Sequence, residues 1–169
     1  MCLAVADTGP LHYLVLIGEI GLLPALVNAL LIPPEVRDEL DHARTPAPVR
    51  AWTAAPPAWL RVQSAPPTGA DPGLARLDPG ERAAIGLALA AGADAVLVDD
   101  RAGVAAARAR GLAAIGTLGL LQRGARRGLV DLPDAIARLV ATNFHIRQEL
   151  LDMLLAEDRA RRGEPTDGA

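Results

Sequence analysis

The chain has few of the residues that mark secreted, thiolate-metal or membrane proteins. Cys2 is the single cysteine among 169 residues, so no internal disulfide can form and a thiolate zinc site is excluded. Residues 1–14 lack the positive flank, long apolar stretch and cleavage site of a signal peptide. No apolar run approaches the roughly 20 residues that a membrane-spanning helix needs. We therefore expect a cytoplasmic protein in a reducing compartment, with no membrane partner.

Aromatic residues and excess positive charge are also scarce. Aromatic residues make up 2% of the chain and hydrophobic residues 51%, so the core must consist of Leu, Val, Ile and Ala. Basic residues number 17 and acidic residues 20, which gives a net charge of −3 and no global basic field that would attract nucleic acid. Any nucleic-acid binding must come from a local patch.

Short apolar runs alternate with helical patterns along the chain. This alternation predicts a three-layer α/β/α sandwich around a mostly parallel sheet with right-handed crossovers. The length predicts one domain, over residues 1–156, followed by a frayed tail over 157–169. Thr8 suits the N-cap of the first helix. Strands are expected at 2–6, 29–32, 60–63, 95–98 and 113–115, and helices at 11–17, 22–28, 35–40, 49–54, 81–91, 103–110, 118–126, 132–142 and 148–161.

Acidic residues stand next to several of the apolar segments. Asp7 and Asp99 end predicted strands, and Glu39 and Glu81 are expected in the first turns of predicted helices. Because ligands bind outside the carboxyl ends of the strands in open parallel sheets, we expect the four to share one edge. Asp100 directly follows Asp99, and two adjacent acids at the end of a buried strand repel each other without a partner.

Grouped carboxylates favour a hard divalent cation. Oxygen ligands select Mg²⁺ or Mn²⁺ over zinc, and the three histidines, His12, His42 and His145, have no metal-ligand spacing. Such an ion can lower the pKa of water, orient a phosphodiester and stabilise the charge that develops during in-line attack. The pattern therefore predicts a metal-dependent nuclease.

The chain resembles the PIN-domain ribonucleases, and within them a bacterial and archaeal branch related to the toxins of toxin–antitoxin pairs. The resemblance covers residues 3 to about 155 and depends on the order and spacing of motifs. Four segments carry it: DTGPLHYL at 7–14, LIPPEVRDEL at 31–40, LDPGERAAIGLALAAGADAVLVDDRAG at 77–103 and GTLGLLQRGARRGLV at 116–130.

The resemblance implies a PIN-like fold and an endoribonuclease that uses Mg²⁺ or Mn²⁺ to cut RNA. It also implies a homodimer and an antitoxin protein as partners. Asp7, Glu39, Glu81 and Asp99 match the catalytic and metal-binding acids of the family, and Thr8 matches a hydroxyl position that orients the first of them. This chain has VDDR where many PIN toxins have Thr-x-Asp, so Asp100 is an alternative ligand, direct or through water.

Arginine can contact phosphate through its bidentate geometry, although a run of arginines is more often a solvated helix face. Arg101 is the strongest candidate for a phosphate contact because it directly follows the acidic pair, and Thr8 is a weaker one. Trp52 and Trp59 are expected to anchor the irregular middle segment or a subunit contact rather than to stack on bases.

The sequence alone also allows other interpretations of these residues and of the function. Asp7 alone could be a turn residue, Glu39 could belong to a polar helix face, and Glu81 could complement a helix dipole. A non-catalytic module that acts through a protein or nucleic-acid partner is the main alternative. An aspartyl phosphatase is disfavoured because position 9 is Gly rather than Asp. A stripe of leucines could close the core, form a dimer or receive an antitoxin helix: Leu150, Leu151, Leu154 and Leu155.

Overall fold

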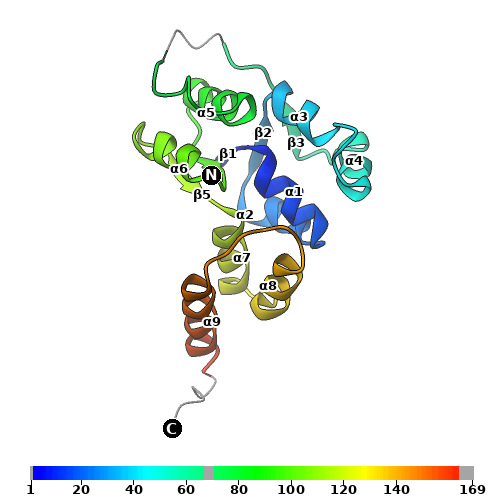
Figure 1. Ribbon diagram of the computed structural model, residues 1–169, viewed down its shortest axis with the longest axis vertical. Helices are drawn as coiled ribbons and strands as arrows, with labels where there is room; N and C mark the ends of the chain where they lie inside the picture. Colours follow the sequence, from blue (N-terminus) through cyan, green and yellow to red (C-terminus); the bar gives the residue numbers. More distant parts are fainter. Residues whose placement is uncertain (1, 67–70, 164–169) are drawn as a thin grey trace.

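Five parallel strands form the centre of the molecule (Figure 1). The computed structural model describes residues 2–66 and 71–163. The strand order is β3-β2-β1-β4-β5, so β1 is central and pairs with both β2 and β4. The strands are β1 Leu3–Ala6, β2 Ala29–Ile32, β3 Leu60–Val62, β4 Ala95–Leu97 and β5 Ala113–Ile115.

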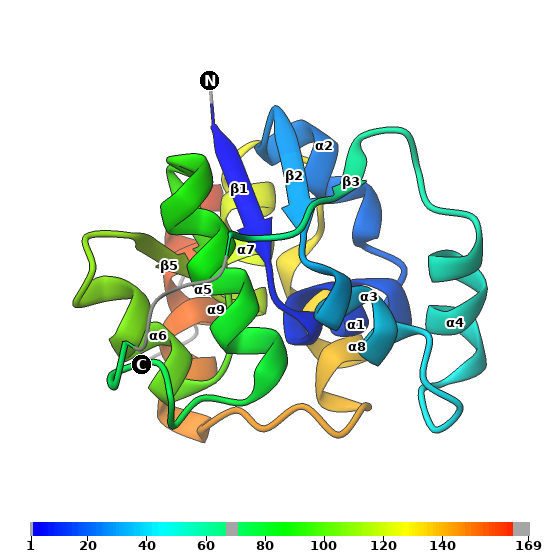
Figure 2. The same cartoon turned by 90° about the horizontal axis from the view of Figure 1, so that it is seen from above.

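Helices cover both faces of this sheet, which confirms the predicted three-layer α/β/α sandwich. Figure 2 shows α5 and α6 on one side of the sheet and α7 and α8 on the other. The helical segments are α1 Thr8–Leu16, η1 Ile20–Leu22, α2 Leu23–Leu26, α3 Pro34–Leu40, α4 Ala47–Ala54, α5 Pro79–Ala91, α6 Arg101–Arg108, α7 Thr117–Arg126, α8 Leu132–Val140 and α9 Gln148–Arg162.

Successive strand residues point into two separate hydrophobic cores. Ala4 and Ala6 of β1 join a core with α1, α7 and α8, whereas Val5 joins a second core with α5 and α6. The same alternation occurs in β4, where Leu97 faces the first core and Val96 the second. Because both faces are buried there, β1, β2 and β4 are continuously apolar rather than alternating, as expected for a parallel sheet, whereas the edge strand β3 contains the exposed Arg61.

Two sequence-based placements near the sheet edge are wrong. Asp7, not Thr8, is the N-cap of α1, because the backbone is still extended at Asp7 and the helix begins at Thr8. Glu39 lies in the last turn of α3 rather than in the first. That helix ends at Leu40, where the chain turns at Asp41, so Glu39 sits at its carboxyl end.

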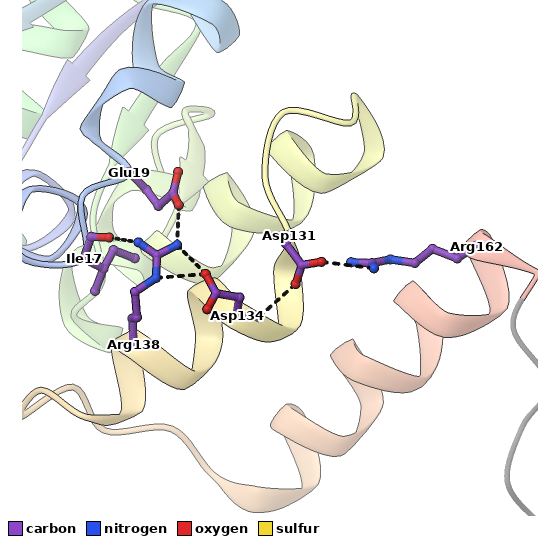
Figure 3. A network of polar contacts seen from close by, with 6 residues as sticks. All are labelled: Ile17, Glu19, Asp131, Asp134, Arg138 and Arg162. Atoms are coloured by element: carbon purple, nitrogen blue, oxygen red, sulfur yellow. Dashed lines mark hydrogen bonds and ion pairs between the residues drawn. The ribbon is translucent and has the colours of Figure 1, made fainter.

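The C-terminal helix extends beyond the predicted domain boundary. α9 runs to Arg162, so residues 157–162 are helical and not part of a frayed tail, and residues 164–169 lie outside the described residues. Buried Asp158 in this segment pairs with Arg161 at 2.6 Å and with Arg162 at 2.8 Å. Figure 3 shows Arg162 reaching Asp131, the N-cap of α8, at 3.2 Å. The contact between Arg162 and Asp131 ties the last helical turn to the body of the protein.

A second polar cluster in Figure 3 joins α8 to the end of α1. Arg138 donates hydrogen bonds to the carbonyl oxygen of Ile17 and to Glu19, the latter at 2.5 Å, and pairs with Asp134 at 2.9 Å.

Among the described residues, no single helix is long and apolar enough to cross a membrane. One bent pair of helical segments, Thr8–Leu16 and Ile20–Leu26, reaches the necessary length and apolar composition only when the two are taken together.

The leucine stripe of α9 packs on the first hydrophobic core. Leu154 is buried, and Leu150, Leu151 and Leu155 are partly buried against the same core. Met153 is the residue of this helix that leaves a large apolar side chain half exposed. The stripe therefore helps to close the core, and its dimer and antitoxin roles stay predictions.

Candidate active site

The carboxyl ends of β1 and β4 form the switch point of the sheet. The chain runs outward from β1 through β2 to β3, and then returns to the other side of β1 for β4 and β5. Asp7 follows β1, and its backbone N–H donates to the carbonyl oxygen of Leu97 at 2.9 Å, which locks the ends of the two strands together. Asp99 lies two residues after Leu97, the last residue of β4. Both predicted strand-end acids thus lie at the edge where ligands bind in open α/β sheets.

Four helix N-termini start near this edge, and each contributes partial positive charge from unpaired backbone N–H groups. α1 starts after Asp7, α5 after Asp78, α6 after Asp100 and α7 after Gly116. The local fold therefore offsets part of the negative charge that the sequence places here.

Asp7 is buried, with 8% of its surface exposed. The pKa of Asp7 is raised from 3.8 to about 6. Burial is the largest cause, the carboxylates of Asp78 and Glu39 act in the same direction, and the backbone amides of Thr8 and Gly9 oppose the rise. Its surroundings thus destabilise the charged form of Asp7, and a bound cation would offset that destabilisation.

Glu81 is also buried, with 5% of its surface exposed. The pKa of Glu81 is raised to about 7, mainly by burial and also by the charges of Asp78, Asp100 and Asp7. The side chain packs closely on α6, since a Cβ atom on Gly103 would lie 3.1 Å from Glu81 Oε1. Helix-dipole complementarity alone does not explain a carboxylate in so desolvated a position.

Glu39 is brought to the site from the end of α3. Thr8 Oγ1 donates a short hydrogen bond to Glu39 Oε2, so the hydroxyl orients Glu39 rather than the adjoining Asp7. The start of α5 approaches the same carboxylate so closely that a Cβ atom on Gly80 would lie 2.7 Å from Glu39 Oε1. Glu39 also lines a cavity of about 1000 Å³ together with His12, Pro79 and others.

Asp99 and Asp100 have different surroundings. Thr117 donates two hydrogen bonds to Asp99, from its backbone N–H to Oδ1 and from Oγ1 to Oδ2, each at 2.7 Å. Burial raises the pKa of Asp99, and the two bonds from Thr117 oppose that rise. Asp100 is exposed, and its Oδ1 accepts from the backbone N–H of Ala102 at 2.7 Å as the N-cap of α6. Asp99 is the acid held inside the site.

Arg101 is exposed and lines a separate cavity of about 420 Å³ that also contains Asp99. The guanidinium is therefore on the same side of the sheet edge as the proposed ligand. The phosphate contact itself stays a prediction for both Arg101 and Thr8.

Two residues of the site were missed from the sequence. Asp78, the N-cap of α5, is the first, because its charge raises the pKa values of both Asp7 and Glu81. Thr117 is completely buried and holds both oxygens of Asp99. The available signal was the Gly116-Thr117 pair directly after the apolar run 113–115, because a hydroxyl at the end of a neighbouring strand can reach the same edge.

The donor chemistry fits a hard divalent cation. Every candidate ligand is a carboxylate, and within residues 2–66 and 71–163 neither Asp7, Glu39, Glu81 nor Asp99 forms an ion pair with a basic side chain. In the same ranges, no three His, Cys, Asp or Glu side chains are arranged so that they could hold a metal ion. The acids thus lie at one edge of the sheet, where the charge of Glu39 raises the pKa of Asp7 and the charge of Asp7 raises the pKa of Glu81. Within the described residues they do not form a three-ligand metal site.

Comparison with known proteins gives one match. A family model described as a PIN domain matches residues 3–159. No curated protein and no solved structure matches the chain.

Proposed function

The chain belongs to the PIN-domain family, and on this premise we propose that it is a Mg²⁺- or Mn²⁺-dependent endoribonuclease that hydrolyses phosphodiester bonds in RNA. One observation carries the proposal. Two buried carboxylates, Asp7 and Glu81, have raised pKa values at the switch point of a parallel sheet, where further carboxylates face them. Buried carboxylates with raised pKa values do not stabilise a fold by packing, and they are typical of functional sites.

In this proposal Asp7, Glu39, Glu81 and Asp99 hold the cation, and two hydroxyl groups fix their orientation. Thr117 holds Asp99, and Thr8 holds Glu39. Asp100 acts as a helix cap and contributes negative charge beside Glu81. A bound cation supplies a Lewis acid that activates water and stabilises the charge of in-line phosphoryl transfer. Arg101 contacts a phosphate of the substrate beside Asp99.

The test uses Asp7→Asn with Asp152→Asn as a matched control, since Asp152 is an exposed acid of α9. We expect the wild-type protein to cleave single-stranded RNA in the presence of Mn²⁺, and we expect EDTA to abolish this cleavage. Asp7→Asn should lose cleavage while melting at least as high as wild type without metal, because the substitution removes a buried charge. Asp152→Asn should behave as wild type. Undiminished cleavage by Asp7→Asn would contradict the proposal.

The second candidate is a non-catalytic binding module with the same fold. The lack of a three-ligand metal arrangement within the described part of the chain favours it. This alternative predicts that Mn²⁺ does not raise the melting temperature of the wild-type protein and that RNA is bound without being cut. The nuclease proposal instead predicts that Mn²⁺ raises the melting temperature and that the RNA is cut.

A toxin role, an antitoxin protein and a homodimer stay predictions that rest on the family resemblance. The leucines of α9 do not support them, because those side chains pack on the core of their own chain. Light scattering of the purified protein would test the dimer, and growth arrest on expression would test the toxin role. A monomer in solution would contradict the homodimer, and normal growth on expression would contradict the toxin role. Neither result would contradict the nuclease proposal.

A further inference from the structure

The first two turns of α1 present different faces to the acidic edge. Thr8 donates its hydrogen bond to Glu39. A Cβ atom on Gly9 would lie 3.2 Å from Asp99 Oδ2, so the Gly9 face of the helix is the one turned toward Asp99. Tyr13 comes four residues after Gly9 and therefore lies on the same face, one turn further along the helix. Because helical side chains lean toward the N-terminus of their helix, the Tyr13 ring leans back toward Asp99.

The electrostatics agree with this placement of the Tyr13 phenol. The pKa of Tyr13 is raised above its ordinary value of 10.0, mainly by burial and also by the charge of Asp99. The phenol therefore stays protonated at neutral pH and keeps its O–H group as a donor. The carboxylates of the site are acceptors, so Tyr13 adds a neutral donor that they lack.

Two aromatic neighbours fix the Tyr13 ring. The ring centroid lies 5.0 Å from that of His12 and 4.9 Å from that of Phe144, and both contacts are edge-to-face. Neither contact involves the hydroxyl group. A substitution that removes the hydroxyl alone therefore leaves the packing of the ring intact.

Tyr13 stands between the two cavities that adjoin the acids. His12 and Asn143 line the cavity of about 1000 Å³ on the α3 side. Phe144 lines the cavity of about 420 Å³ that contains Asp99. Since Tyr13 contacts residues of both cavities, a substrate that reaches the acids from either one passes close to its hydroxyl.

The hydrogen bond that the Tyr13 hydroxyl makes in this structure is weak. It donates to Asn143 Oδ1 at 3.3 Å, which is longer than the usual O–H···O distance of about 2.7–2.8 Å. Asn143 is exposed and belongs to the segment between α8 and α9, which runs in orange along the side at which β1 and β2 end (Figure 2). An anionic oxygen accepts a shorter and stronger bond than an amide does. The phenol can thus leave Asn143 for a phosphate oxygen.

We propose that Tyr13 is a further catalytic residue, whose hydroxyl leaves Asn143 and donates a hydrogen bond to a non-bridging oxygen of the phosphate group that is cut. A preorganised donor at this position stabilises the negative charge that the phosphate oxygens carry in the transition state. The phenol keeps its proton throughout, so its role is to donate a hydrogen bond and not to act as an acid. The inference rests on the proposed nuclease function and adds to it a residue outside the group of acids.

The first experiment breaks the bond between Tyr13 and Asn143 from each side. Tyr13→Phe removes the hydroxyl and keeps both ring contacts, and Asn143→Ala is the matched control, because it removes the partner and keeps the hydroxyl. RNA cleavage in Mn²⁺ gives kcat and KM for the wild type and both variants. Melting temperatures with and without Mn²⁺ report the fold and the response to the cation.

We expect Tyr13→Phe to lower kcat roughly 10- to 100-fold with KM within about threefold, as loss of a donor used in the transition state does. Its melting temperature and its response to Mn²⁺ should match those of the wild type. Asn143→Ala should cleave at least as fast as the wild type, because its phenol has no bond to give up. Equal losses in the two variants would show that the bond only holds the segment between α8 and α9, and would overturn the inference.

The second experiment observes the phenol directly. Tyr13 is the single tyrosine of the chain, so labelling the full chain with 3-fluorotyrosine gives one ¹⁹F signal. A short RNA is added in Ca²⁺, which takes oxygen ligands and is not paramagnetic. We expect the signal to shift on addition of the RNA, and an unmoved signal would overturn the inference. This measurement decides alone if Tyr13→Phe melts well below the wild type.

Failure of the inference and failure of the proposed function give different results. Cleavage by the wild type together with a wild-type kcat in Tyr13→Phe would overturn the inference and leave the nuclease in place. A wild-type protein that cuts no RNA in Mn²⁺ would contradict the nuclease, and with it the catalytic role of Tyr13. A shifted ¹⁹F signal in such a protein would assign Tyr13 to RNA binding instead.

Discussion

Thr117 engages both carboxylate oxygens of Asp99, with its backbone N–H and its hydroxyl each at 2.7 Å. The pair joins the end of β4 to the start of α7, and Thr117 is completely buried. A Cβ atom on the preceding Gly116 would lie 2.8 Å from Asp99 Oδ1, so the chain also needs a glycine beside this contact. Asp99 is therefore fixed by its neighbours before any ligand binds.

Thr117→Val should separate the positioning role of the hydroxyl from its place in the core. Valine has nearly the same shape but loses one hydrogen bond to a carboxylate, which is worth about 1.5–3 kcal/mol. We expect Mn²⁺-dependent RNA cleavage to fall roughly 10- to 100-fold, and Thr117→Ser to retain most of it. Cleavage rates and melting curves of both variants provide the measurement. Equal rates for the valine and serine variants would exclude the role.

Asp99→Asn and Asp100→Asn should have unequal effects. Asparagine caps a helix about as well as aspartate, so Asp100→Asn keeps the cap of α6 and most of the cleavage. Asp99→Asn removes a ligand charge from the site and should reduce cleavage to background. The two variants change the net charge equally, which makes each the control for the other. A larger loss for Asp100→Asn would reverse the assignment of the ligand.

Gly80→Ala should disturb the site more than the fold. The added Cβ atom would lie 2.7 Å from Glu39 Oε1, and the flexible end of that side chain can move away. We expect a melting temperature close to wild type without metal and a smaller rise when Mn²⁺ is added. Gly21→Ala is the control, because nothing lies within 4 Å of its Cβ position. An unchanged Mn²⁺ response in Gly80→Ala would show that Glu39 does not bind the cation.

The stability of the metal-free protein should depend on the protonation of Asp7. Because its pKa rises from 3.8 to about 6 on folding, the folded state binds more protons than the unfolded state between these values. The stabilising contribution is complete below about pH 4 and is lost as the pH rises through 6. A shift of this size corresponds to about 2–3 kcal/mol.

The comparison of wild type with Asp7→Asn isolates this effect. In EDTA, the advantage in unfolding free energy of the asparagine variant should be near zero at about pH 4 and should grow up to about pH 7. Urea unfolding at several pH values gives the measurement, and Asp152→Asn should show no such trend. Mn²⁺ should reduce the difference at neutral pH, because a cation compensates the buried charge that asparagine lacks. A constant difference across this range would contradict the raised pKa.

The fold was predictable from the sequence because its apolar runs are short and sharply bounded. The run Ala95–Val98 is stopped by two acids and preceded by a glycine turn at Gly92, so few alternatives to a buried strand exist. The predicted helix and strand boundaries mostly agree with the observed ones to within two residues. Asp7 and Asp99 were correctly placed at strand ends for the same reason.

The site was less predictable because its geometry depends on contacts between distant segments. The hydrogen-bond partner of Thr8 is Glu39 on α3, and the sequence around Thr8 does not indicate that these two residues meet. The choice between Asp99 and Asp100 required knowing where α6 begins, since one residue of difference decides which side chain caps the helix. Asp78 caps α5 by accepting from the backbone N–H of Glu81 at 2.9 Å, and its charge also raises the pKa values of Asp7 and Glu81. The local sequence gives no measure of that second effect.

The central position of β1 has a consequence for synthesis on the ribosome. Asp7 is made early, but its strand pairs on one side with β4, and the residue that fixes Asp99 is Thr117. The first hydrophobic core also needs α7, α8 and α9 to be complete. A nascent chain therefore cannot assemble the acidic edge until most of it has left the exit tunnel.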